Sequence, residues 1–411
     1  MVPLFKFKFH IVQNLSTEVI LIILSAVVVV SYLFSILSRY IKVPSVLLLL
    51  MSGVVLRVIA DANNKGIVIP NRMVEFLGVT GLIMIILEAG LDLKLSRGKL
   101  SLIRNSFFAA LVIFLLSATG ISAILYYLLH EPLRNCVIYA TPLSIMSSSI
   151  VIPSLHHLTA LKKEFLVYEA SFSDIIGILV FNLLTEGEGV SAHAMSMFFV
   201  NILLSIILSL VFSSLLFLIL TKSALNIKFF LVFALLIFLY VGGKMLHLPS
   251  LIVILIFGLL MNNWQLVRIP YLRLLFPPSA VQSVTSLLHS LTAESSFLIR
   301  TFFFILFGYS INLHLIADSS VITIGSLVVV VLFITRFMYL RFFLKENVYP
   351  EVMFIPRGLI TILLFYKIPA AFRLQSFNEG ILFFVVLVTS LILMLGTIFY
   401  RQKRDELIEE S

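Results

Sequence analysis

Long apolar runs recur along the whole chain, separated by short clusters of charged residues, proline, glycine or asparagine. A run of about 20 apolar residues crosses the roughly 30 Å of hydrocarbon in a bilayer. The pattern therefore predicts an all-α polytopic membrane protein with about thirteen transmembrane helices, the second and ninth of them short. These spans cover residues 18–38, 43–60, 73–93, 102–129, 134–158, 164–184, 194–221, 227–247, 248–262, 291–312, 319–343, 350–371 and 379–400.

Composition supports this reading. Hydrophobic residues make up 61% of the 411 residues and charged residues only 12%, and the mean hydropathy is +1.14, which is outside the range of soluble domains. We expect residues 1–411 to form a single membrane transport domain that ends in a short cytoplasmic tail, 401–411. The lone cysteine, Cys136, excludes an internal disulfide framework and a cysteine-rich metal site, and no cofactor is indicated.

The basic residues predict the orientation in the membrane. Three of the 29 Lys and Arg residues, Arg300, Arg336 and Arg357, fall inside predicted spans; 17 others follow odd-numbered spans, and 9 lie on the opposite side. Because cytoplasmic loops are enriched in Lys and Arg, the C-terminus is predicted in the cytoplasm and, with thirteen spans, the N-terminus outside. The net charge of +9 is spread over short loops, so it does not indicate nucleic-acid binding. We expect a bacterial inner (plasma) membrane as the location.

Two segments of the chain resemble two later ones. KVPSVLLLLMSGVVL at 42–56 shares Pro-Ser and Gly at equal spacing with HLPSLIVILIFGLLM at 247–261, and LDLKL at 91–95 resembles INLHL at 311–315. Both pairs are shifted by seven spans, and an odd shift reverses the direction of crossing. The pattern favours an inverted repeat, over about 43–184 and 248–400, which is typical of transporters. The alternative is that leucine-rich spans resemble each other by chance.

The fifth and twelfth spans, which such a repeat would relate, both contain helix-disrupting residues. Proline removes a backbone donor and glycine loosens a helix, so we expect both spans to break near the middle of the membrane and to expose backbone groups that can hold an ion. The alternative is a set of kinks and packing contacts. The residues concerned are Thr141, Pro142, Ser147, Ser148 and Ser149 in the fifth span and Pro356, Arg357 and Gly358 in the twelfth.

Carboxylates lie where apolar residues are expected. The sixth span contains EASFSD, with Glu169 and Asp174, and the third and tenth spans contain Glu88 and Glu294 within or near their ends. A charged side chain at the bilayer centre costs about 2.5–3.5 kcal/mol on insertion scales, so such residues face a bundle interior or water and are functional candidates. Glu294 and Arg300 are expected to form a local structural pair.

Helical spacing separates the two acids of EASFSD. Glu169 and Asp174 lie roughly 140° apart around the helix and about 7.5 Å apart along it, so they do not bind one ion as a same-face pair. Asp174 has the hydroxyl of Ser171 at i−3, which favours a partly dehydrated cation there. Glu169 is expected to pair with a buried arginine, for which Arg300, Arg336 and Arg357 are the candidates.

A lone buried carboxylate binds either a proton or a cation. If only the loaded forms can reorient across the membrane, this competition becomes obligatory exchange of the two. A cation channel is one alternative, but nothing in the sequence resembles a carbonyl filter or a repeated acidic ring. An intramembrane carboxylate-dyad enzyme is the other, with Glu88 and Asp174 as its only plausible pair.

The motifs resemble those of the monovalent cation:proton antiporter superfamily, on its sodium/proton exchanger side. EASFSD followed by Ile-Ile-Gly is similar to the family's Glu-Ser-x-x-Asn-Asp motif. In addition, LEAGLDL at 87–93, RTFFFILFGYSINL at 300–313 and IPRGLITILLFYKIP at 355–369 resemble its third-helix, Phe-rich and Arg-Gly regions. The matches follow the family's order over nearly the whole chain.

The resemblance implies that Asp174 binds the cation and the proton, that Glu169 pairs with Arg336, and that Glu88 lies near the ion. It also implies a homodimer with a moving core and a static dimerisation domain. The expected cation ligands are Asp174, Ser173, Ser171, Glu88 and Ser148. Ser173 replaces the family's usual Asn, and the serines at 147–149 stand where many members have Thr-Asp. Because of these two departures, Na⁺ cannot be assumed over K⁺. The resemblance favours Na⁺, with K⁺ or Li⁺ as alternatives, and the single acid implies electroneutral exchange.

Overall fold

The computed structural model describes residues 17–41, 43–62, 71–95, 97–155, 158–186, 192–222, 229–245, 248, 250–264, 278–311, 318–344 and 349–400, and all regular structure in these ranges is helical. The expected tail at 401–411 lies outside them. The helices are α1 Thr17–Ile41, α2 Ser45–Ala62, α3 Asn71–Asp92, α4 Leu100–Leu129, α5 Leu133–Ser144, α6 Ser148–Val151, α7 Ala160–Glu186, α8 Ala192–Lys222, α9 Phe229–Met245, α10 Ser250–Asn262, α12 Pro278–Ser310, α14 Ser319–Tyr339, α15 Leu359–Tyr366 and α16 Gly380–Phe399.

Every predicted span contains helix, so the all-α class is confirmed. By length and composition, seven helical segments of the described ranges can cross a membrane. One helix begins well before its predicted span. The tenth span was predicted from residue 291, whereas α12 begins at Pro278, in a polar stretch that hydropathy alone does not mark as helix. The predicted break in the twelfth span is confirmed, since a 3-10 turn at Glu351–Met353 and extended backbone precede α15, where prolines and Gly358 interrupt the helix.

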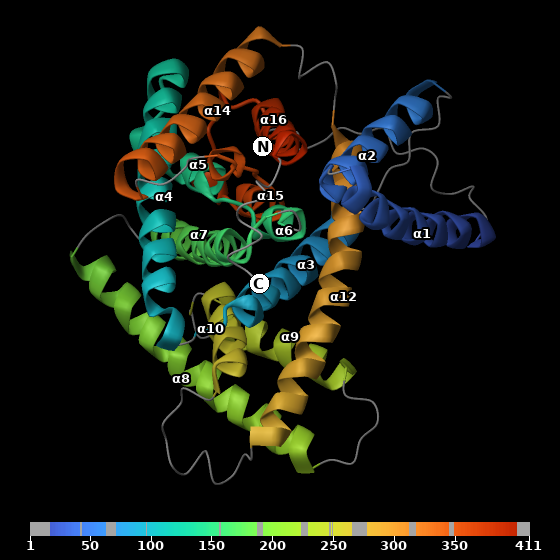
Figure 1. The fold of residues 1–411 in the computed structure, drawn as a ribbon, viewed down its shortest axis with the longest axis vertical. Coiled ribbons are helices and arrows are strands. Elements are labelled where there is room, and N and C mark those ends of the chain that lie inside the picture. The colour runs from blue at the N-terminus through green and yellow to red at the C-terminus, as the bar shows by residue number, and fades with distance from the viewer. Residues whose placement is uncertain are drawn as a thin grey trace.

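The helices gather into two groups (Figure 1). One, here called the crossing bundle, consists of α4–α7 and α14–α16, with α4 packed against α5, α7 and α14, and α14 against α16. The other, here called the outer bundle, consists of α1–α3, α8–α10 and α12. Within it α2 packs along α12 and α3 along α10, while α1 lies at the edge against α2 and α12. Since α3 also contacts α7, it joins the two groups next to the candidate site.

Glycines set the closest contacts in the outer bundle. Gly53 of α2 faces Gly308 of α12, and a Cβ atom on either would lie 2.2 Å from a backbone carbonyl oxygen of the facing helix. Gly90 of α3 faces Gly258 of α10, where added Cβ atoms would lie 2.7 and 2.9 Å from such oxygens. Small residues let membrane helices approach this closely, because little hydrophobic force drives helices together in lipid. These contacts fix α3 and α12, which carry Glu88 and Arg300.

Candidate ion-binding site

Two interrupted segments cross at the centre of the crossing bundle. The chain leaves helical geometry between Ser144, the last residue of α5, and Ser148, the first of α6. The second interruption is the extended stretch that precedes α15. The two meet where the backbone amide of Ser147 donates to the carbonyl oxygen of Pro356 over 3.0 Å. A Cβ at position 358 would lie 2.4 Å from the Ser147 hydroxyl oxygen and 2.9 Å from Ser147 Cβ, so a larger residue there would push Ser147 away.

Arg357 holds this crossing together from a buried position. Its Nε donates to the Leu143 carbonyl oxygen over 2.7 Å and its Nη1 to the Ile355 oxygen over 3.1 Å. Its backbone amide donates to Thr389 Oγ1 over 3.1 Å. The carbonyls at the end of α5 carry partial negative charge, so a guanidinium beside them is stabilising. Among the described residues no carboxylate lies within ion-pair distance of Arg357.

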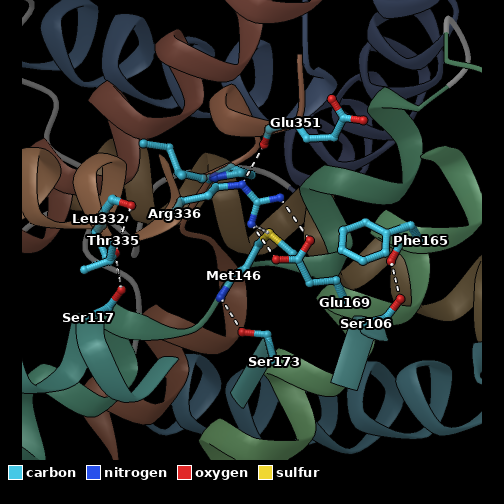
Figure 2. Close-up of polar contacts among 12 residues, drawn as sticks. Ser106, Ser117, Met146, Phe165, Glu169, Ser173, Leu332, Thr335, Arg336 and Glu351 are labelled. Atoms are coloured by element: carbon cyan, nitrogen blue, oxygen red, sulfur yellow. Dashed lines mark hydrogen bonds and ion pairs between the residues drawn. The ribbon is translucent and has the colours of Figure 1, made fainter. Parts of the chain in front are cut away.

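Asp174 of α7 lies beside the crossing and is fully buried. Its Oδ2 accepts a hydrogen bond from Ser148 Oγ over 2.5 Å. Its Oδ1 is buried and has no hydrogen-bond partner within the described ranges. The neighbouring Ser173 Oγ accepts from the backbone amide of Met146 over 2.8 Å, in the break between α5 and α6 (Figure 2). An unpaired carboxylate oxygen in a protein interior costs free energy unless a proton or a cation binds it.

Glu169, also on α7, is hydrogen-bonded through both of its carboxylate oxygens, unlike Asp174. Its two oxygens accept from Arg336 Nη1 and Nη2 at 2.6 and 3.0 Å, and both side chains are almost completely buried (Figure 2). Arg336 also donates through Nε to the Glu351 carbonyl oxygen over 2.6 Å. The bidentate geometry satisfies the carboxylate on both oxygens. Arg336 is the arginine that the sequence resemblance implies, and it lies on α14.

Glu88 and Arg300 form a second intramembrane pair. Arg300 Nη2 donates to Glu88 Oε1 over 3.2 Å, with side-chain exposures of 16% and 18%. The expected pair of Arg300 with Glu294 was therefore wrong. Glu294 lies on another side of α12 and accepts from the Tyr32 hydroxyl over 2.9 Å. Glu88 thus reaches the site region from the outer bundle, on a helix that contacts α7.

The other predicted residues have local partners. The Ser171 hydroxyl donates to the Val167 carbonyl oxygen over 2.8 Å, and the Thr141 hydroxyl donates to that of Val137 over 2.9 Å. Both are i−4 bonds within a helix. The Ser147 and Ser149 hydroxyls bond each other over 2.9 Å, and Pro142 lies in the last turn of α5.

Sequence reasoning missed the contributions of Met146, Leu143, Glu351 and Thr389. Leu143 and Glu351 accept through backbone carbonyl oxygens and Met146 donates through its amide, and side-chain identity carries no signal for such bonds. The Met146 thioether also accepts from Arg336 Nη1 over 3.5 Å. Thr389 lies on α16, away from every motif, and only the folded arrangement brings its hydroxyl to Arg357. A small cavity lies between the Glu169–Arg336 pair and Ser173.

Comparison with known proteins now decides the family. A family model for the transmembrane part of sodium/hydrogen exchangers matches residues 23–400. The chain belongs to the sodium/hydrogen exchanger family. It is thus a member of the cation:proton antiporter superfamily and an integral membrane protein. Members of this family are transporters and not enzymes, which removes the carboxylate-dyad alternative.

Two solved structures share the fold of this chain. The chain is similar to the sodium proton antiporter MjNhaP1 from Methanocaldococcus jannaschii at pH 8, with a TM-score of 0.67 and 18% identity over 93% of this chain and 99% of that one. A second structure, an electron-microscopy map of MjNhaP1, gives a TM-score of 0.64 and 16% identity over 95% of this chain and 100% of that one. No curated protein matches the chain by sequence.

Proposed function

We propose that this member of the sodium/hydrogen exchanger family exchanges a monovalent cation for a proton at Asp174. The observation that carries the proposal is the buried Oδ1 of Asp174, which has no partner among the described residues. That oxygen takes up either a proton or a partly dehydrated cation. Both cannot bind at once, so the two compete for one group. Na⁺ is the favoured cation, since the similar fold of MjNhaP1 belongs to a sodium proton antiporter, and K⁺ and Li⁺ are alternatives.

The proposed cation ligands come from both sides of the site. Asp174 supplies the charge. Ser148 belongs to the broken span and bonds Asp174, and Ser173 Oγ accepts from the Met146 amide within that span. Glu88 approaches from α3. Ser171 donates its hydrogen to the Val167 carbonyl oxygen and keeps its oxygen lone pairs for a cation. Oxygen ligands of this kind suit a small hard cation.

The charges around the site support electroneutral exchange. With every group ionised, three carboxylates face three guanidinium groups: Glu88, Glu169 and Asp174 against Arg300, Arg336 and Arg357. Binding either H⁺ or a monovalent cation at Asp174 adds the same single charge. The two loaded forms are therefore electrically equivalent, and one cation is exchanged for one proton.

Internal symmetry of the contacts supports an inverted repeat and alternating access. Under the proposed shift of seven spans, α2 corresponds to α10 and α3 to α12. The packing of α2 on α12 then maps onto that of α10 on α3, and each pair is closed by facing glycines. We propose that the crossing bundle carries Asp174 between the two membrane faces while the outer bundle stays fixed within a homodimer. From the distribution of Lys and Arg, we propose that the C-terminus lies in the cytoplasm and the N-terminus outside.

The test is an exchange assay with purified protein in proteoliposomes. A trapped pH dye reports proton movement after a pulse of Na⁺, K⁺ or Li⁺, and the assay is repeated at two imposed membrane potentials. We expect a cation-driven pH change whose rate does not depend on the potential. Cation flux without proton movement would indicate a channel, and no response to any of the three ions would refute the proposal.

A further inference from the structure

The Glu88–Arg300 pair differs from the Glu169–Arg336 pair in geometry and in place. One hydrogen bond of 3.2 Å joins Glu88 to Arg300, whereas two bonds of 2.6 and 3.0 Å join Glu169 to Arg336. The side chains of Arg300 and Glu88 are 16% and 18% exposed, whereas those of Arg336 and Glu169 are 2% exposed or less. A single, longer and partly exposed contact between charges is weaker than a buried bidentate one. Arg300 can therefore leave Glu88 at a smaller cost than Arg336 can leave Glu169.

Glu88 faces the groups of the site from the outer bundle. It lies on α3, which packs against α7, the helix of Asp174, so that the two negative charges repel each other. The other charged or titratable groups around it are Arg300 and His289 from α12 and Asp92 from its own helix, where Asp92 bonds His289 over 3.0 Å. Ser296 lies one turn before Arg300, and its buried hydroxyl lies beside the Glu88 carboxylate as well. The only basic side chain bonded to Glu88 in these ranges is Arg300.

We propose that Arg300 sets the affinity of the site for both transported ions. Its guanidinium neutralises Glu88 and moves away from this carboxylate when Na⁺ binds. This inference rests on the proposed function. While Arg300 covers Glu88, Asp174 is the only unneutralised acid of the site. When a cation reaches Asp174, Glu88 supplies a further oxygen to it and the Arg300 guanidinium moves toward the Ser296 hydroxyl, which accepts a hydrogen bond. Arg300 is thus a positioning residue for Glu88.

If the pair only held α3 and α12 together, the two substitutions would have effects different from those of the proposal. With such a structural role, removing either partner would lower the maximal rate or the amount of folded protein. In the proposal, the two removals have opposite signs. Arg300→Gln leaves an extra negative charge beside Asp174, so H⁺ and Na⁺ both bind more tightly. Glu88→Gln leaves an extra positive charge, so both bind more weakly.

The experiment measures the KM for Na⁺ and the pH profile of exchange in proteoliposomes for four variants: Arg300→Gln, Arg300→Lys, Glu88→Gln and the double variant Glu88→Gln/Arg300→Gln. For Arg300→Gln we expect a KM for Na⁺ at alkaline pH that is roughly three- to tenfold lower than in the wild type. The acidic limb of the profile, where exchange falls off as the pH decreases, should lie about one pH unit higher. Glu88→Gln should move both quantities the other way. The double variant should return the acidic limb close to that of the wild type, and Arg300→Lys should stay near the wild type in both.

The controls separate this inference from the proposed function. Arg57→Gln removes the arginine of a pair with Asp61 on α2, whose nitrogen and oxygen lie 2.7 Å apart, and should leave the KM unchanged. Wild-type exchange that disappears in Asp174→Asn upholds the proposed function independently. If the wild type exchanges but Arg300→Gln and Glu88→Gln shift the KM in the same direction, or not at all, Arg300 does not set the affinity. Arg300→Lys shows whether loss of folding explains the Arg300→Gln result.

Discussion

Glu169 and Asp174 lie five residues apart on α7, yet their carboxylates have opposite environments. Both oxygens of Glu169 accept hydrogen bonds from Arg336, while one oxygen of Asp174 accepts from Ser148 and the other has no partner in the described residues. Helical spacing explains the difference, because five residues rotate the two side chains to different faces of α7. One acid is fixed to a neighbouring helix, and the other is left to bind an ion.

The first prediction concerns the buried pair. Glu169→Gln leaves the Arg336 guanidinium uncompensated in the protein interior, so we expect a loss of about 3–5 kcal/mol in the free energy of unfolding. Thermal unfolding in detergent should show a markedly lower midpoint. The matched control is Asp61→Asn, which breaks an exposed pair on α2 and should cost less than about 1 kcal/mol. Equal stability of the two variants would contradict a structural role for Glu169.

The second prediction concerns the hydroxyl that contacts Asp174. Ser148 Oγ donates to Asp174 Oδ2, and a donor of this kind stabilises the ionised carboxylate. Ser148→Ala removes the donor and favours the protonated form, so the acidic limb of the exchange profile should move to higher pH and the KM for Na⁺ should rise. Ser149→Ala is the matched control, since Ser149 bonds Ser147 instead. A pH profile of Ser148→Ala that matches the wild type would refute this assignment.

The third prediction tests the close helix contacts. Gly308→Val places side-chain atoms against the backbone of α2, where even a Cβ would lie 2.2 Å from the Leu50 carbonyl oxygen. The helices must separate, so we expect destabilisation of at least about 1–3 kcal/mol, measured by thermal unfolding and by the yield of monodisperse protein. Gly242→Val on α9 meets no atom within 4 Å of its Cβ and should retain most of the stability. Similar losses in both would argue against the close contact.

Sequence patterns predicted the parts of this molecule that depend on local order. Apolar runs marked the helices, and the spacing within EASFSD separated the roles of Glu169 and Asp174 before any contact was known. The resemblance to the family also named Arg336 as the partner of Glu169, which the 2.6 Å contact shows. These features are carried by residue type and by position along the chain.

Other parts depend on contacts between distant helices. Arg300 was expected to pair with Glu294 on its own helix, but the packing of α3 against α12 presents Glu88 to it instead. Pro356 and Gly358 predicted the break before α15, but they did not predict the partners of the broken segment. The Ser147 amide bonds the Pro356 carbonyl oxygen and the Arg357 side chain bonds the Leu143 carbonyl oxygen, and such partners leave no mark in the sequence.

Asp174→Asn gives the most direct test of the central claim. Asparagine keeps the size of the side chain and the bond from Ser148 but removes the charge that binds H⁺ and Na⁺. Wild-type protein and Asp174→Asn are reconstituted at equal density, and Na⁺-driven proton movement is followed with a trapped pH dye at acidic and alkaline pH. We predict exchange in the wild type and none in the folded variant. Equal exchange in both proteins would contradict the assignment of Asp174 as the group at which the cation and the proton compete.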